Sequence, residues 1–343
     1  MNSMLLSCSG IKDIFEELHH KFGGNLNSNI KEHVLNLDNE TGKGRISGIT
    51  FTGGISYFDF DITFSENFVV EVETLENTPI CFGYCSKGKL AHSFGHNSNM
   101  DCFENFQTTI LTNAPYVNNL LYFSKDTPTK ISLIVVKTAN NVKQSTLRND
   151  LRFKIQELFF NGLPSKNSIY KGSHNLKIAN KIQQIDSIEQ EGIVRSLLIE
   201  GLIHVTLALE IQQYSDDLLN TKGKSGSLTE TEMDLVLEVS KFIENYPERS
   251  LSLRELTRKS GLSPSKLQEG FKLLHGTTVS DYIRDVRLIK AEKLIKKTNL
   301  NISEVVYSIG FTSRSYFSKI FKLKYNCSPK QYQDKQKNTM MLS

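Results

Sequence analysis

The stretch Gly310–Pro329, GFTSRSYFSKIFKLKYNCSP, decides the fold of the C-terminal part of the chain. Its apolar residues Phe317, Ile320 and Phe321 follow the i, i+3, i+4 spacing that predicts an amphipathic helix. The opposite side of that helix carries basic and hydroxyl side chains, and a set of this kind is usually a solvated face. The stretch therefore predicts a helix that packs on one side and leaves a basic surface on the other.

A second copy of this pattern lies about 50 residues earlier in the chain. The two copies are LRELTRKSGLSPSKLQEGFKLLHGTTVSDYI at 253–283 and ISEVVYSIGFTSRSYFSKIFKLKYNCSPKQYQ at 302–333. Each copy has a short helix, a turn that contains glycine, a Ser/Thr helix start and a second amphipathic helix. This is the helix-turn-helix unit, whose second helix enters the major groove of DNA.

Local signals in both copies agree with this assignment. Gly261 and Gly310 stand where the backbone must turn through the left-handed region. Ser263 and Thr312 are suitable N-cap residues, and Pro264 fits the first position of a helix. Between the copies, residues 279–298 predict a long helix. As a rigid spacer it would hold the two reading helices about one DNA turn, roughly 34 Å, apart.

Charge is distributed unevenly along the 343 residues. Residues 249–343 hold 19 Lys and Arg against 7 Asp and Glu, a net charge of +12, whereas residues 1–248 carry −8. A basic block on an acidic body is typical of a protein that binds a polyanion. The length itself favours about two domains.

The C-terminal hundred residues resemble the DNA-binding domain of the AraC/XylS family of bacterial transcription regulators. The matching residues include Leu253–Leu256, Leu267, Phe271, Lys272, Arg287, Ala291, Leu294, Ile309–Phe311, Ser315–Lys322 and Ser328–Tyr332. The chain departs from the family pattern at Thr257, at Asn326, where glycine is common, and at Gln333, where arginine is usual. The resemblance implies a sequence-specific transcription regulator, and more an activator than a repressor. Its partners would be double-stranded DNA, RNA polymerase and a second copy of the chain in a homodimer.

The resemblance also implies roles for individual residues. The predicted base contacts are Ser265, Gln268 and Glu269 in the first unit and Arg314, Ser315, Ser318 and Lys319 in the second. The predicted phosphate contacts are Lys266, Lys272 and Lys322. Arg314 is the strongest candidate, because an arginine near the start of a recognition helix can bond guanine O6 and N7 together. Tyr316, Phe317, Phe321 and Tyr325 are expected to be mostly core.

The N-terminal part predicts strands rather than helices. The segment ISYFDFDITF at 55–64 alternates apolar and polar residues, which indicates a half-buried strand. Similar short runs continue to about residue 140 and favour an antiparallel sandwich or barrel. Helical periodicity returns over 148–218, where one apolar stripe could pack on the β-structure or form a dimer seam: Leu198, Leu202, Val205 and Leu209.

The predicted fold class is α+β and multidomain. The predicted domains are a β-rich domain over 1–145, a helical connector over 146–219, a linker over 220–232 and an all-α DNA-binding domain over 233–336. The resemblance implies that the first of these is a cupin-like antiparallel barrel that binds a small effector. Segments 55–64, 82–95 and 189–213 are similar to the PchR-type branch, which implies a ferric siderophore as the effector.

A metal-dependent enzyme is a competing hypothesis. His92 and His96 share a strand face but would stand about 13 Å apart along it, too far to share one ion, and Cys81 and Cys85 have the same spacing. Surface histidines and buried thiols are therefore expected, with no metal site and no cofactor. The favoured interpretation is not an enzyme. A cupin-type enzyme with a basic helical appendage and a ligand-independent architectural DNA-binding protein remain as alternatives.

The sequence also bears on cellular location. Five dispersed cysteines argue against a disulfide scaffold and favour a cytoplasmic protein with reduced thiols. Leu5–Cys8 resembles a lipid-attachment site, but no positive segment and no apolar run of sufficient length precede it. The sequence predicts no stretch that approaches the roughly 20 apolar residues of a membrane span. The sequence therefore predicts a cytoplasmic protein that does not enter a membrane.

Overall fold

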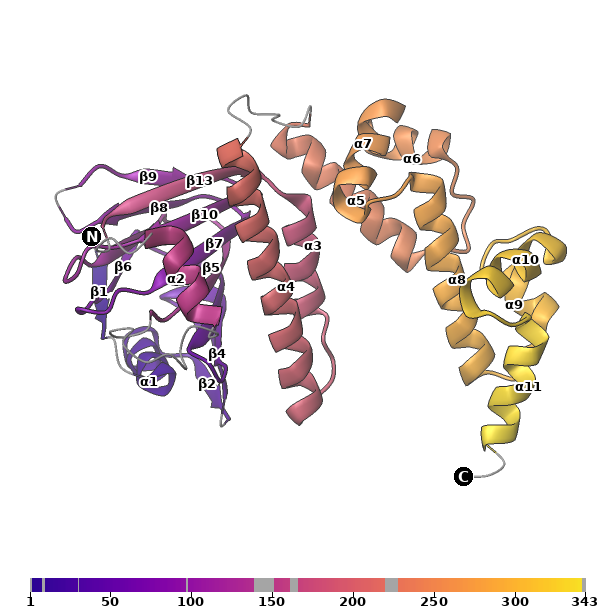
Figure 1. Cartoon of the computed structure of the whole chain (residues 1–343), viewed down its shortest axis with the longest axis horizontal. Coiled ribbons are helices and arrows are strands. Elements are labelled where there is room, and N and C mark those ends of the chain that lie inside the picture. The colour runs from indigo at the N-terminus through magenta and orange to yellow at the C-terminus, as the bar shows by residue number, and fades with distance from the viewer. Residues whose placement is uncertain are drawn as a thin grey trace. The chain divides into compact units, whose positions relative to one another are not determined.

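The computed structural model (Figure 1) describes residues 2–7, 10–29, 31–96, 98–138, 151–160, 166–219 and 228–340. The chain divides into two compact units, Met1–Gly226 and Ser227–Ser343. Among the described residues, all strands belong to the first unit and the second is helical. The predicted boundary at 145/146 and residues 220–227 of the predicted linker lie outside the described residues.

Two β-sheets form the body of the first unit. The five-stranded sheet has the order β1-β6-β11-β8-β9 and the eight-stranded sheet β13-β10-β7-β12-β5-β4-β3-β2. Neighbouring strands are antiparallel except β1, which runs parallel to β6. The strands are β1 (Asn2–Leu6), β2 (Asn25–Ser28), β3 (Glu32–Asn39), β4 (Gly42–Thr50), β5 (Ile55–Phe64), β6 (Phe68–Val72), β7 (Ile80–Lys87), β8 (Leu90–Phe94), β9 (Asp101–Phe103), β10 (Gln107–Thr112), β11 (Asn119–Phe123), β12 (Thr129–Val136) and β13 (Ser168–His174).

The prediction of a closed cupin-like barrel is not confirmed, because the strands form two open sheets. Within the described residues no strand joins the edges of one sheet to those of the other. Alternation along a strand reveals which side chains face the core. Closure depends instead on how the edge strands pair, and a period-two pattern does not encode that pairing.

Both sheets and one helix share a single aromatic core. Helix α1 (Ile11–Phe22) contributes Phe15 and Phe22 to it, the eight-stranded sheet contributes Phe64, and the five-stranded sheet contributes Phe123. The rings of Phe22 and Phe64 lie 5.1 Å apart, and those of Phe64 and Phe123 lie 5.4 Å apart in a T-shaped contact. The contact of rings from the helix and both sheets holds the three layers together.

The alternation in strand β5 predicts a half-buried strand, but the first part of its outer face is also covered, and only Asp61 on that face is exposed. Tyr57 and Asp59, on the face predicted to be exposed, are both buried. The Asp59 carboxylate accepts a 2.7 Å hydrogen bond from the Ser132 hydroxyl and lies 3.8 Å from the Lys130 ammonium. Lys130 also pairs with Asp186 at the end of helix α3 at 2.6 Å. Helical residues thus cover the outer face of the sheet through a polar network, which the alternation at 55–64 does not reveal.

Three further helices complete the described part of this unit: α2 (Leu151–Phe160), α3 (Leu176–Asp186) and α4 (Gly192–Leu219). Helix α4 buries Ile199, Ile203 and Leu207, while Leu198 and Val205 of the predicted stripe stay exposed. Arg195 of α4 donates to both carboxylate oxygens of Glu32 in β3, at 2.8 and 2.9 Å. This bidentate pair fixes the start of α4 on the eight-stranded sheet.

Helix α4 contradicts the expectation that no segment would be apolar enough to span a membrane. Its most apolar stretch has a mean hydropathy of 1.6, and 22% of that stretch is buried. Length and composition alone place it in this class, and a packed helix of a soluble protein meets the same test. The hydropathy of α4 therefore does not by itself establish a membrane span.

The second unit contains α5 (Glu230–Asn245), α6 (Leu253–Ser260), α7 (Pro264–His275), α8 (Val279–Lys297), α9 (Ile302–Ser308), α10 (Arg314–Tyr325) and α11 (Pro329–Met340). The predicted turns are confirmed: Gly261 has φ 74° and Gly310 φ 81°. Ser263 caps α7 and Pro264 opens it as predicted. Helix α10 is capped by Ser313 instead of Thr312, because the Ser313 hydroxyl accepts the backbone N–H of Tyr316 at 3.2 Å.

Candidate nucleic-acid interface and ligand cavity

Helix α10 separates its packing residues from its outward-facing ones. Phe317 and Phe321 are fully buried against residues of α8 and α9. Arg314, Ser315, Lys319 and Lys322 are exposed, and Ser318 is half-buried. Because positions 315, 319 and 322 are spaced i, i+4, i+7, these side chains follow one face of the helix. The predicted base and phosphate contacts of the second helix-turn-helix unit therefore share one accessible surface.

Tyr316 does not belong to the core as the sequence suggested. Its side chain is 48% exposed, and only the edge of its ring approaches Phe311, with centroids 6.1 Å apart. The neighbouring Phe317 supplies the buried contact at this turn. Tyr316 is thus an additional accessible side chain at the start of α10, where a phenol can stack or donate a hydrogen bond.

The corresponding face of α7 is more constrained by contacts within the unit. Ser265 and Lys272 are exposed and Glu269 is half-buried. The Gln268 Oε1 atom accepts the backbone N–H of Val279, the first residue of α8, at 3.2 Å. The Lys266 ammonium pairs with Glu232 of α5. Gln268 and Lys266 therefore hold α7 to its neighbours, a role that the sequence did not predict for either residue.

The two recognition helices also differ in charge. Positions 50 residues apart correspond, so Lys272 matches Lys322 and Ser265 matches Ser315, but Glu269 stands where α10 has Lys319. Helix α10 presents Arg314, Lys319 and Lys322 to solvent, whereas α7 presents Lys272 beside the half-buried Glu269, and its half-buried Lys266 is paired with Glu232. The accessible face of α10 is therefore more basic than that of α7.

Helix α8 connects the two helix-turn-helix units. Arg287 on this helix donates hydrogen bonds to the carbonyl oxygens of Pro247 at 2.8 Å and Arg249 at 2.9 Å. Its guanidinium also lies over the Phe311 ring, 5.5 Å from the centroid. At Gly310 a Cβ atom would lie 2.7 Å from the Glu248 carbonyl oxygen and 2.8 Å from Arg287. The turn between α9 and α10 is thus packed closely against the loop that precedes α6.

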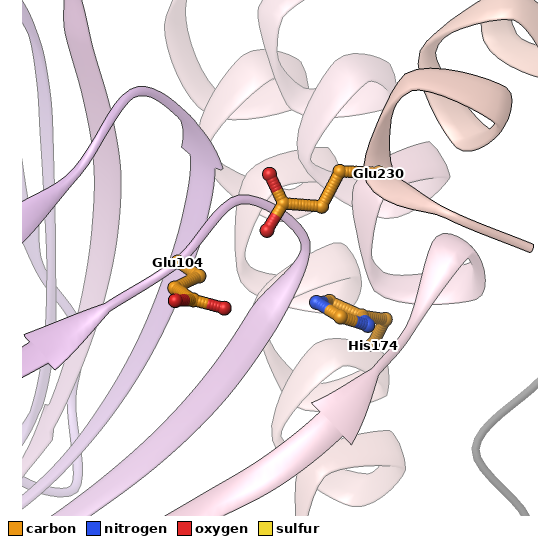
Figure 2. Close-up of side chains that lie close together, drawn as sticks. All are labelled: Glu104, His174 and Glu230. Atoms are coloured by element: carbon orange, nitrogen blue, oxygen red, sulfur yellow. The ribbon is translucent and has the colours of Figure 1, made fainter.

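The first unit brings one histidine close to one glutamate. Glu104 precedes β10 and His174 ends β13, and their ligand atoms lie within 4.8 Å of each other (Figure 2). Glu230, also drawn there, belongs to the other unit. Two side chains are fewer than the three or four protein ligands of a zinc site, so this pair alone does not make a metal centre.

The histidines considered in the sequence do not converge. His92 is buried in β8, where its Nε2 atom is 2.8 Å from the Asn119 Oδ1 atom, and burial lowers its pKa. His96 is 71% exposed and lies 3.5 Å from Glu71. The two residues therefore occupy different environments, one in the core and one at the surface.

A cavity of about 500 Å³ lies between the two sheets of the first unit. Its floor comes from the eight-stranded sheet, and its walls include Leu121 of the five-stranded sheet and Ile14 and Leu18 of α1. Protein interiors contain few voids larger than a water molecule, and unfilled apolar space costs about 24 cal/mol of stability per Å³. The volume falls within the roughly 300–1,000 Å³ typical of small-molecule sites. The family resemblance implied an effector site in this domain, but the residue patterns did not identify which side chains line it.

Comparison with known proteins identifies the helical region. Residues 256–335 match a protein-family model described as a helix-turn-helix domain. Over 103 residues the chain is 29% identical to "Probable transcription factor PqrA" of Proteus vulgaris, a match that covers 29% of this chain and 84% of PqrA. Over 150 residues it is 27% identical to "HTH-type transcriptional activator Btr" of Bacillus subtilis, which covers 43% of this chain and 26% of Btr.

A solved structure of the xylose-binding transcription activator xylR is 31% identical, with 32% of this chain and 28% of that chain covered and a TM-score of 0.28. The chain thus spans less than a third of Btr and of this activator. The relatives matched over the helical region include proteins described as a transcription factor and a transcriptional activator. Residues 256–335 are thus similar to helix-turn-helix domains, including that of a transcriptional activator.

Proposed function

We propose that the protein is a sequence-specific DNA-binding transcription regulator that acts in the cytoplasm and is controlled by a small effector. The observation that carries the proposal is the accessible face of α10, where Arg314, Ser315 and Lys319 stand beside Lys322 over a fully buried Phe317. A rigid helix with one buried face and one basic, hydrogen-bonding face is suited to the major groove of double-stranded DNA.

The two recognition helices would contribute unequally to binding. Base reading in the second helix-turn-helix unit would come from Arg314, Ser315, Ser318 and Lys319. In the first helix-turn-helix unit, Ser265 and Glu269 are the accessible base-reading candidates, because the Gln268 oxygen is already bonded to Val279. For Gln268 to read a base, its other amide atom would have to face the DNA.

Phosphate contacts would position both helices. Lys272 and Lys322 are exposed at equivalent positions of the two units. Lys266 would first have to leave Glu232, which would reduce the net gain from a phosphate contact. Affinity independent of sequence would therefore depend mainly on Lys272 and Lys322.

The cavity of the first unit is the proposed effector site. A ferric siderophore is the effector suggested by the sequence resemblance to the PchR-type branch. The cavity walls are mainly apolar, which favours a different chemistry, because a ferric complex is polar and needs donors or charges around it.

The remaining partners follow from the same proposal. The exposed Leu198 and Val205 of α4 support a homodimer, since contiguous exposed apolar side chains often mark a protein interface. Activation would require contact with RNA polymerase. An architectural DNA-binding protein is the second candidate, and it differs by having little sequence preference and a binding constant dominated by salt.

The test is selection of bound sequences from a random DNA pool at about 150 mM salt, which suppresses non-specific binding. The expected result is two short motifs roughly ten base pairs apart, one for each recognition helix. A parallel selection with added cell extract supplies any required effector. If folded protein enriches no sequence in either selection, the chain is not a sequence reader.

A further inference from the structure

The floor of the cavity includes a row of residues that crosses four neighbouring strands. In this row Phe58 pairs with Leu133, Leu133 with Gly83, and Gly83 with Thr109. All four of these residues line the cavity. The row therefore runs from β5 through β12 and β7 to β10 on the face that meets the other sheet.

Gly83 opens the centre of this row. It has no side chain, while its partners Leu133 and Thr109 stand on either side. A Cβ atom at Gly83 would lie 3.3 Å from the Leu133 Cδ2 atom and 3.8 Å from the Thr109 carbonyl oxygen, so a side chain would fit only with a small shift of Leu133. Glycine in a strand interior often marks close approach of a ligand.

The walls select against charged molecules. Among the described residues that line the cavity, only Glu73 and Lys137 are charged. Each stands just after the last residue of a strand, Val72 and Val136, and Lys137 is exposed. A charged group over the floor would be desolvated without a partner of opposite charge, which is strongly unfavourable.

Thr109 provides one polar group deep in the cavity. It is 1% exposed, and no hydrogen-bond partner for its hydroxyl oxygen lies among the described residues. The Ser56 hydroxyl differs, because it shares a 3.0 Å hydrogen bond with the Thr50 hydroxyl. Buried polar atoms nearly always have a partner, and a rotation of the Thr109 side chain toward the cavity would let its hydroxyl bond a bound molecule.

We propose that this cavity binds a neutral, mainly hydrocarbon molecule that bears one hydroxyl or carbonyl group, and that this group bonds the Thr109 hydroxyl. Gly83 makes room for the hydrocarbon, and Thr109 sets its orientation. The inference rests on the proposed function in one respect, namely that this molecule is the effector.

The experiment measures binding of N-phenyl-1-naphthylamine, an apolar dye that fluoresces in apolar sites, to the full-length protein. The expected result is saturable binding that 1-decanol displaces and a ferric hydroxamate does not. Gly83→Val should weaken dye binding at least about tenfold, because two methyl groups enter the space above the floor. If Gly83→Val fails to fold by circular dichroism, Leu133→Phe fills the same space with a ring.

Two threonine variants test the orienting contact. Thr109→Val should leave dye binding intact and weaken decanol binding about 3- to 10-fold, the equivalent of one lost hydrogen bond. Thr108→Val is the matched control: Thr108 is also 1% exposed with an unpartnered hydroxyl among the described residues, but it is absent from the cavity lining. Equal effects of the two variants, or no saturable dye binding, would overturn the inference.

Retention of selected DNA is measured on the same preparations. Saturable dye binding with the Thr109 effect supports the inference whether or not a DNA motif is found. Absence of a motif contradicts the proposed function alone.

Discussion

The guanidinium of Arg287 lies 5.5 Å from the centroid of the Phe311 ring, which joins the connecting helix α8 to the turn of the second helix-turn-helix unit. The same guanidinium donates to the carbonyl oxygens of Pro247 and Arg249, ahead of the first unit. One side chain thus contacts segments that flank both reading units. Arg287 therefore links the loop before α6 to the turn before α10.

Arg287→Ala should lower the free energy of unfolding by about 1–3 kcal/mol, because two backbone carbonyl groups lose a charged donor. Arg284→Ala on the same helix is the control. Arg284 makes a partly exposed pair with Asp281 at 2.8 Å, so its loss should cost less than about 1 kcal/mol. Chemical denaturation of the three proteins measures the difference. Equal destabilisation by both substitutions would show that the contacts of Arg287 with Pro247, Arg249 and Phe311 do not add to the free energy of unfolding.

Arg314→Ala should weaken binding to the selected DNA by about 1–3 kcal/mol and relax the preference at one base pair. The reason is that an exposed arginine at the first position of α10 can bond two acceptors of one guanine. Repeating the DNA selection with the variant identifies the affected position. A uniform loss on every sequence would instead assign Arg314 to phosphate.

Lys322→Ala should weaken binding to all DNA sequences alike and reduce the slope of log affinity against log salt by about one unit. Lys324→Ala, two residues further along, is the control, because Lys324 is already paired with Asp285 at 3.1 Å. Titrations of fluorescent DNA at several salt concentrations give both slopes. Lys322 does not contact phosphate if its slope equals that of the unsubstituted protein.

The sequence predicted the C-terminal unit in detail because its signals are local. Gly261 and Gly310 adopt the expected left-handed turns, and Asn326, which stands in place of a common glycine, ends α10 with φ 57°. The error at Tyr316 came from assigning adjacent aromatic residues to one face, although consecutive helical positions diverge by about 100°. Contacts between distant segments, such as that of Lys266 with Glu232, leave no periodic trace in the sequence.

The first unit was harder to predict because its decisive features are pairings between remote strands. Alternation at 55–64 identified a strand, but neither the two open sheets nor the row Phe58–Leu133–Gly83–Thr109 follows from alternation. The cavity arises where glycine meets that row, and a single glycine in a strand has several common explanations. Only the register of the paired strands distinguishes these explanations for Gly83.

Gly270→Ala should destabilise the helical unit Ser227–Ser343 by about 1–3 kcal/mol, although alanine favours a helix more than glycine does. A Cβ atom at Gly270 in α7 would lie 2.3 Å from the Val236 Cγ2 atom in α5, so the two helices would have to separate. The double variant Gly270→Ala with Val236→Ala removes the clash and should recover part of the stability. Thermal unfolding followed by circular dichroism tests both variants. A stabilising effect of Gly270→Ala would mean that α5 and α7 do not pack this closely.

The helical unit Ser227–Ser343 should lose stability as the pH falls below about 6.5. Burial lowers the pKa of His275 to about 4, whereas the unfolded chain has the ordinary value near 6.5. Below pH 6.5 the unfolded state therefore binds a proton that the folded state refuses, and stability falls until the pH reaches the folded pKa. The ring lies 3.8 Å from that of Tyr282 and its Nε2 atom is 2.8 Å from the Ser240 hydroxyl, so protonation would occur in a packed site.

The expected loss from His275 between pH 7 and pH 5 is about 1–2 kcal/mol. Denaturant titrations at the two pH values measure it, and His275→Gln provides the control because glutamine retains a hydrogen-bonding group but does not titrate. The variant should show a smaller pH dependence by that amount, since the remaining histidines and carboxylates are common to both proteins. An identical pH dependence in both proteins would mean that His275 takes up a proton as readily in the folded state as in the unfolded chain.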